Sequence, residues 1–148
     1  MNISTLLAFT TKVERAYEAV CQDVLDEFNL SKTSFDILMF LSEHPDRYTA
    51  KEISATKNIR ANVVSLHVEK LVNSGYLVRE SVEGDRRKIR LICTEQAQSL
   101  IEKGRAIHQT FFPALVDGLT QEEMECFKHC FQIVEQNADL LSTGKTEG

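Results

Sequence analysis

The sequence lacks the features that would assign it to several common classes of protein. No apolar run approaches the roughly 20 residues of a membrane-spanning helix. The first 15 residues have no basic region leading into an apolar stretch, as a signal peptide would, so we expect a cytoplasmic protein that does not contact a membrane. The cysteines show neither a disulfide framework nor zinc-finger spacing, which fits reduced thiols. They are Cys21, Cys93, Cys126 and Cys130.

The usual signatures of an enzyme are also missing. The chain has no glycine-rich phosphate loop, no nucleophile with a base at motif spacing, and no quartet of metal ligands. Internal repeats and low-complexity segments are absent as well. We therefore predict a protein that is not an enzyme and that binds no cofactor and no metal.

What the chain does contain is one domain's worth of sequence with an uneven charge. Its 148 residues are 43% hydrophobic, and the formal net charge is −5. Residues 51–90 hold nine Lys or Arg against five Asp or Glu, a local charge of +4, which leaves −9 for the remainder. A local positive field attracts phosphate, so this basic segment is the candidate for contact with nucleic acid.

The pattern in and before the basic segment predicts two short helices joined by a tight turn. Thr49 and Glu52 form a capping box that begins the first helix, which ends near Thr56. Asn58 tolerates the left-handed backbone that such a turn often needs. The second helix, residues 60–74, has an apolar face at three-to-four-residue spacing. Polar groups near its N-terminus can reach base edges in a major groove, although an ordinary solvated face has the same pattern. That face carries Arg60, Asn62, Ser65, Glu69 and Lys70.

A two-stranded hairpin with a basic tip is predicted directly after these helices. Residues 76–82 and 89–94 are rich in β-branched and aromatic side chains, and Gly84-Asp85 suits the turn. The three cations of residues 86–88 would project from the tip, where an arginine can enter the narrow minor groove. We expect Asp85 to pair with one arginine and aim it. The combination favours a winged helix-turn-helix that binds DNA.

With these residues in view, the chain resembles the MarR family of transcriptional regulators over about residues 30–141. The wing signature Asp85-Arg86-Arg87, followed by Thr94, is the most specific part of the resemblance. The family implies a homodimer on a pseudo-palindromic operator, usually a repressor released by a small molecule or by oxidation. Departures at Arg60, His67, Cys93 and Ala97 prevent transfer of an operator sequence. The matching positions are Leu30-Ser31, Leu38, Leu41, Glu52-Ile53, Val64, residues 68–71, residues 75–79, Asp85-Arg86-Arg87, Leu91, Thr94 and residues 118–123.

The expected fold is mainly α with a small β-hairpin wing: a winged helix-turn-helix plus N- and C-terminal dimerisation helices. We expect one MarR-like domain over residues 1–148. Its parts are a DNA-binding lobe at 31–95, dimerisation helices at 1–30 and 96–141, and a flexible tail at 142–148. The other predicted helices are 3–28, 33–43, 95–112 (capped by Thr94 and interrupted or kinked near Pro113) and 121–141 (capped by Thr120 with Glu123).

The outer helices carry more apolar surface than one winged helix can cover. We expect a second copy to bury it, which would set the two recognition helices about one DNA turn, roughly 34 Å, apart. A monomeric bundle is the alternative. The predicted DNA-binding residues are Thr49, Lys51, Asn58, Arg60, Ala61, Asn62, Val63, Ser65, Lys70, Asp85, Arg86, Arg87 and Lys88.

Several side chains are candidates for sensing a signal. Cys21 and Cys126 could be redox-active. Cys126 and Cys130 supply only half of a thiolate shell, with His108 as a distant third ligand, which is why no metal is expected. His67 is interpreted as a hydrogen-bonded structural histidine. An effector pocket between the dimer helices and the DNA-binding lobe would be lined by aromatic residues, which at such spacing are more often core. They are Tyr17, Phe35, Phe40, Phe111 and Phe112.

The expected partners are therefore a double-stranded DNA operator, a second copy of the chain and a small-molecule effector. A winged helix that docks another protein is the alternative function. The wing cations distinguish the two, because a protein-docking wing has no need of residues 85–88 whereas contact with DNA does.

Overall fold

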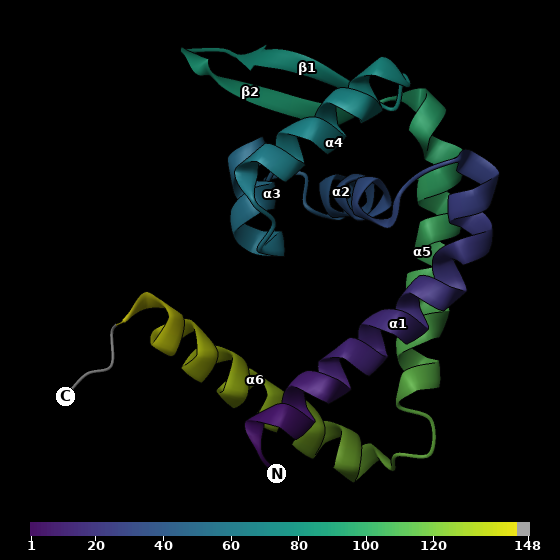
Figure 1. Cartoon of the computed structure of the whole chain (residues 1–148), viewed down its shortest axis with the longest axis vertical. Helices are drawn as coiled ribbons and strands as arrows, with labels where there is room; N and C mark the ends of the chain where they lie inside the picture. Colours follow the sequence, from purple (N-terminus) through teal and green to yellow (C-terminus); the bar gives the residue numbers. More distant parts are fainter. Residues whose placement is uncertain (145–148) are drawn as a thin grey trace. The chain divides into compact units, whose positions relative to one another are not determined.

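The computed structural model describes residues 1–144, which form six α-helices and one β-hairpin (Figure 1). They divide into two compact units, Met1–Phe111 and the part of the chain from Phe112 onward. In chain order the elements are α1 (Ile3–Phe28), α2 (Lys32–Glu43), α3 (Ala50–Lys57), α4 (Ala61–Asn73), β1 (Leu77–Val82), β2 (Asp85–Cys93), a 3-10 turn (Glu95–Ala97), α5 (Gln98–Leu115) and α6 (Gln121–Thr143).

The core of the first unit is built around α2, which is buried on most sides. Phe35, Ile37 and Leu38 are fully enclosed, and each such side chain contributes about 1.5–3 kcal/mol relative to exposure. Gly104 of α5 is buried where an added Cβ would collide with side chains of α2. The other helices and both strands of this unit each contribute at least one buried apolar residue: Cys21, Ile53, Val64, Leu71, Leu77, Leu91, Leu100 and Ile101.

The turn between α3 and α4 forms as its residues indicate. The capping box of Thr49 and Glu52 is present at the start of α3. Asn58 has φ 52°, in the left-handed region, and its N–H bonds the carbonyl of Ser54. The Ser54 hydroxyl also donates to the Ile59 carbonyl at 2.6 Å. These local bonds fix the direction in which α4 leaves the turn.

The hairpin differs from its prediction at the tip. β1 and β2 pair antiparallel from Leu77–Cys93 to Ser81–Ile89, and the register then shifts so that Val82 lies opposite Asp85. The turn is Glu83-Gly84, not Gly84-Asp85, because Asp85 already pairs with Val82 as the first residue of β2. Gly84, the second turn residue, takes a left-handed φ of 83° that glycine adopts at low cost. The three cations of residues 86–88 therefore lie in a bulge on β2.

Two predictions about α5 are wrong. Thr94 makes no side-chain cap, because its hydroxyl donates to the Gly75 carbonyl at 2.6 Å and the 3-10 turn precedes the helix. Pro113 does not interrupt the helix, which runs on to Leu115. The alternative of a kink at Pro113 stays a prediction. The carbonyl that the proline leaves unbonded belongs to Gln109, which is exposed, so water can satisfy it.

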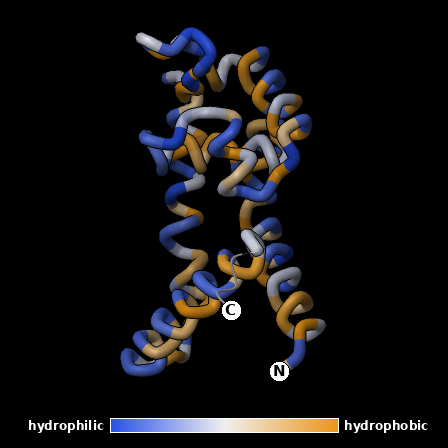
Figure 2. Tube along the Cα trace, turned by 90° about the vertical axis from the view of Figure 1, so that its left-hand side faces the viewer, coloured by the Kyte–Doolittle hydropathy of each residue, from blue (hydrophilic) through white to orange (hydrophobic). Residues whose placement is uncertain are grey.

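The second unit consists of the end of α5, a turn at Gly118 and α6. The predicted capping box of Thr120 and Glu123 begins α6, which runs through Thr143. Of the predicted flexible tail, Ser142 and Thr143 are helical, and residues 145–148 lie outside the described part. Within residues 1–144 no helix is long and apolar enough to span a membrane. Along α1, which starts at the point marked N in Figure 2, hydrophobic and hydrophilic residues alternate at helical spacing.

Candidate nucleic-acid interface

The exposed face of α4 carries short polar side chains close to its N-terminus. Asn62 and Ser65 are exposed, whereas Val64 and Val68 on the opposite face are buried in the core. This arrangement presents hydrogen-bonding groups outward from a rigidly packed helix. Leu66, which was not among the predicted contact residues, is 54% exposed on the same helix and is placed to contact a thymine methyl group.

The N-terminus of α4 is open to an anion. Arg60 is the N-cap residue and makes no side-chain capping hydrogen bond, while its carbonyl accepts from the N–H groups of Val63 and Val64. The first amide groups of a helix have no partner inside it, and the helix dipole places partial positive charge there. Since no side chain caps this end, a phosphate oxygen can.

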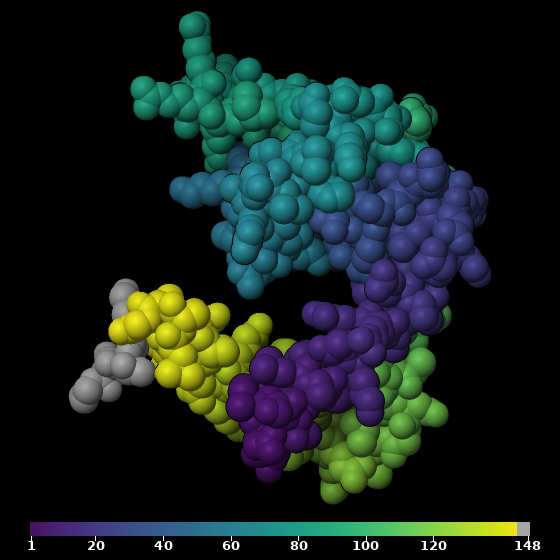
Figure 3. Space-filling model, viewed as in Figure 1, coloured from purple at the N-terminus to yellow at the C-terminus, as the bar shows by residue number. Residues whose placement is uncertain are grey.

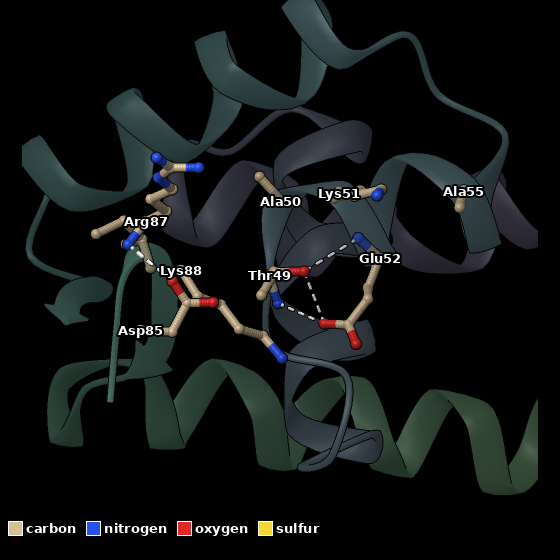
Figure 4. Close-up of a pocket in the computed structure, with 9 residues that line it drawn as sticks. Thr49, Ala50, Lys51, Glu52, Ala55, Asp85, Arg87 and Lys88 are labelled. Carbon is tan, nitrogen blue, oxygen red and sulfur yellow. Dashed lines mark hydrogen bonds between the residues drawn. The ribbon is translucent and has the colours of Figure 1, made fainter. Parts of the chain in front are cut away.

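A pocket of about 660 Å³ connects the start of α3 to the wing (Figure 4). The Glu52 carboxylate accepts hydrogen bonds from the Thr49 side chain and from its backbone N–H, and these bonds, with the charge of Lys88, lower its pKa and keep it ionised. The pocket thus brings two predicted contact regions together. Its lining is Thr49, Ala50, Lys51, Glu52, Ala55, Asp85, Arg87, Lys88 and Ile89.

A second pocket, of about 360 Å³, lies between α3 and α4 and is lined by Lys51, Ala61 and Ser65 among others. Predicted residues from both helices therefore share one groove. The predicted residues that line neither pocket are Asn58, Arg60, Asn62, Val63, Lys70 and Arg86. Asn58 forms the turn, and Lys70 lies in the last turn of α4, both with exposed side chains.

The role expected of Asp85 is different in the structure. Its carboxylate accepts a hydrogen bond from the backbone N–H of Arg87 at 3.0 Å and forms no ion pair with Arg86 or Arg87 within residues 1–144. A carboxylate two residues before an N–H closes a local turn more easily than it reaches a mobile guanidinium. Asp85 thus shapes the bulge, and Arg86 and Arg87 are both exposed. The hairpin that carries them projects from the rest of its unit (Figure 3).

Two further residues that support the wing were not predicted. The Tyr48 ring lies 5.1 Å from the Lys88 ammonium and 5.1 Å from the Arg90 guanidinium, and its carbonyl accepts from the Leu91 N–H at 2.8 Å. Arg79 of β1 binds Glu69 of α4 at 2.8 Å. This exposed pair is worth only about 0.2–1 kcal/mol, but it ties the wing to the recognition helix. An aromatic residue directly before the capping box was the only available signal for Tyr48.

The residues predicted to line an effector pocket do not behave alike. Phe35 and Phe40 are buried in the core, whereas Phe112 is 46% exposed in the second unit. Tyr17 and Phe111 pack with ring centroids 5.3 Å apart. The effector pocket therefore stays a prediction.

His108 lies with Tyr17 and Glu43 in a hydrogen-bonded chain that the sequence did not indicate. Its Nε2 is 2.5 Å from the Tyr17 hydroxyl, and its Nδ1 is 2.6 Å from a carboxylate oxygen of Glu43. Burial, and then the charge of Cys21, raise the pKa of Tyr17. These hydrogen bonds connect α1, α2 and α5 within the first unit.

The two candidate redox cysteines differ in access. Cys21 is fully buried, and desolvation raises the pKa of its thiol, which disfavours the reactive thiolate. Cys126 is exposed, and its Sγ lies 3.9 Å from that of Cys130. Redox sensing stays a prediction for both.

Comparison with known proteins finds one family and many structures of the same fold. The MarR family model matches residues 28–88. The HTH-type transcriptional regulator PecS of Dickeya dadantii (strain 3937) is 27% identical over 103 residues, which cover 68% of this chain and only 60% of PecS.

Two similar solved structures contain DNA. A MarR family regulator from Listeria monocytogenes, complexed with 26mer DNA, has a TM-score of 0.79 at 19% identity and covers 96% of this chain and 95% of its own. The S. aureus MepR–DNA complex has a TM-score of 0.76 at 19% identity, covering 93% and 98%. At such identities these structures show a shared fold.

Proposed function

We propose that the chain is a transcriptional regulator of the MarR family, a repressor that binds a pseudo-palindromic operator as a homodimer. In this proposal α4 lies in the major groove and the wing, residues 83–88, reaches the adjacent minor groove. Such a protein catalyses no reaction and acts where the DNA is, in the cytoplasm.

One observation carries the proposal: the exposed polar face of α4, its uncapped N-terminus and the wing cations belong to one packed unit. The wing arginines have no intramolecular ion pair within residues 1–144, so they are free to bind phosphate or a groove. The local charge of +4 over residues 51–90 supplies the attraction that brings DNA to this surface. That two proteins of the same fold have been solved with DNA supports the same ligand here.

The homodimer is supported by the apolar surface that the chain leaves uncovered. Between Gln121 and Thr143 no residue is buried, although Phe127, Phe131, Val134 and Leu141 have large apolar side chains. Such a surface indicates an interface. A second copy would cover it and place two recognition helices roughly 34 Å apart on one side of the DNA.

Release of the operator by a small molecule or by oxidation is part of the proposal. The Tyr17 and Phe111 region and the exposed thiol of Cys126 are the candidate sites. Cys21 is the weaker redox candidate, because it is enclosed.

The test is fluorescence anisotropy on labelled DNA from upstream of the protein's own gene, with a scrambled duplex as control. We expect tight binding that prefers the native duplex and that weakens steeply as salt rises, because phosphate contacts release counterions. Equal and weak binding to both duplexes, insensitive to salt, would contradict the proposal.

A further inference from the structure

Two thiols of α6 lie close enough together to act as one site. Cys126 and Cys130 are one turn apart, both are exposed and free, and their Sγ atoms are 3.9 Å apart. Neighbours on a helix have Cβ atoms about 5.5 Å apart, whereas a disulfide needs about 3.8 Å. The pair is therefore poorly placed to close a disulfide within the helix.

The distance between the sulfurs fits a bridging metal ion of defined geometry. With metal–sulfur bonds of about 2.3 Å, as in zinc thiolates, a tetrahedral ion holds two thiolates about 3.8 Å apart, and a linear one about 4.6 Å. The observed 3.9 Å matches the tetrahedral value. Because both cysteines are on one helix, the backbone already holds them at this spacing.

Metal binding at the pair needs no redox step. A divalent cation that binds both sulfurs replaces their two protons. Each thiol loses one proton, two metal–sulfur bonds form, and no electron is transferred.

We propose that Cys126 and Cys130 form a two-thiolate site for a thiophilic divalent cation of the zinc class. The sequence predicted no metal because two cysteines leave a four-ligand shell incomplete, and the structure adds the matching sulfur–sulfur distance. No group of three or more His, Cys, Asp or Glu that could hold a metal occurs within residues 1–144, so this helix supplies two ligands only.

The two remaining ligands come from water or from the same two thiols of a second copy. Both sources complete the same tetrahedral shell. The second source rests on the proposed homodimer, and the exposed Phe127 and Phe131 beside the cysteines are the surface through which α6 would face its copy. The two-thiolate site itself requires neither the dimer nor DNA binding.

The test is a titration of the reduced full-length protein with Cd²⁺, followed by the ultraviolet charge-transfer absorption of cadmium thiolates. We expect saturable binding, and Zn²⁺ should compete and remove the band. Cys126→Ser and Cys130→Ser should each weaken binding by more than about tenfold, since even outer-shell changes cost 10- to 100-fold. Cys93→Ser, which removes a half-buried thiol elsewhere, is the control and should leave binding unchanged.

The stoichiometry identifies the remaining ligands. If water completes the shell, each chain binds one Cd²⁺ and the absorbance per ion corresponds to two thiolates. If a second copy completes it, two chains share one Cd²⁺ and the absorbance per ion is twice as large. Either result supports the site. Binding that survives Cys126→Ser or Cys130→Ser, in variants whose circular dichroism shows intact helices, overturns it, and so does a failure of Zn²⁺ to compete. No DNA is present, so failure here leaves the proposed regulator untouched.

Discussion

Arg87 is the residue whose removal should weaken DNA binding most directly. Its backbone is fixed by Asp85 and its side chain lines the pocket between α3 and the wing. Arg87→Ala should lower operator affinity by about 1–3 kcal/mol, measured by fluorescence anisotropy. Arg15→Ala removes an exposed cation from α1 and should have no effect. Equal losses in the two variants would mean that only net charge matters.

Electrostatics and geometry predict opposite changes in operator affinity when Asp85 is substituted. Removing an acid from a surface that meets phosphate should strengthen binding if charge alone decides. Because the Asp85 carboxylate holds the Arg87 N–H, we expect Asp85→Ala to weaken operator binding instead. Glu83→Ala, which removes an acid from the hairpin turn, should leave affinity unchanged or raise it. Identical behaviour of the two variants in the same titration would refute the positioning role of Asp85.

Among the elements, α4 is held on α2 by a polar contact as well as by its apolar face. The His67 Nδ1 lies 2.9 Å from the hydroxyl of Ser34, which is 2% exposed. Burial, and then the charge of Lys70, lower the pKa of His67 below its ordinary 6.5. The unfolded chain therefore takes up a proton more readily than the folded one, and stability is lost as the pH falls through 6.5 towards the lowered value.

The lowered pKa of His67 gives a prediction about how the stability of the protein depends on pH. His67→Leu should reduce the loss of stability on acidification, because leucine has no proton to bind. The measurement is the free energy of unfolding in urea at about pH 7.5 and about pH 5.5, on either side of the ordinary histidine pKa. The wild-type protein should lose more stability between the two conditions than the variant. The same loss in both would show that His67 does not contribute.

At the scale of the whole molecule, the uncovered face of α6 decides the proposed assembly. Phe131 is 57% exposed, and a charge there should be costly in an apolar interface. Phe131→Asp should shift the protein from dimer to monomer, measured by light scattering. Gln136→Asp places the same charge on the opposite, polar side of α6 and should keep the dimer. A dimeric mass for Phe131→Asp would place the interface elsewhere.

The features that the sequence determined by itself depend on residues close together in the chain. The two capping boxes, the left-handed turn at Asn58 and the helices of the DNA-binding lobe follow from contacts across three or four residues. The basic hairpin after the second helix was likewise predicted from its local sequence. These local preferences were sufficient to predict the fold class and to suggest the family.

The tertiary structure decided what depends on residues distant in sequence. His108 is 91 positions from Tyr17 and 65 from Glu43 in the sequence, so no local pattern predicts that His108 hydrogen-bonds to them. Tyr48 lies against the wing only because the segment before α3 packs beside β2. Even within the wing, composition suggested that Asp85 pairs with an arginine, whereas the backbone shape of the bulge gave it an N–H partner. The sequence specifies the type of each side chain, but which residues that side chain contacts depends on how the elements pack.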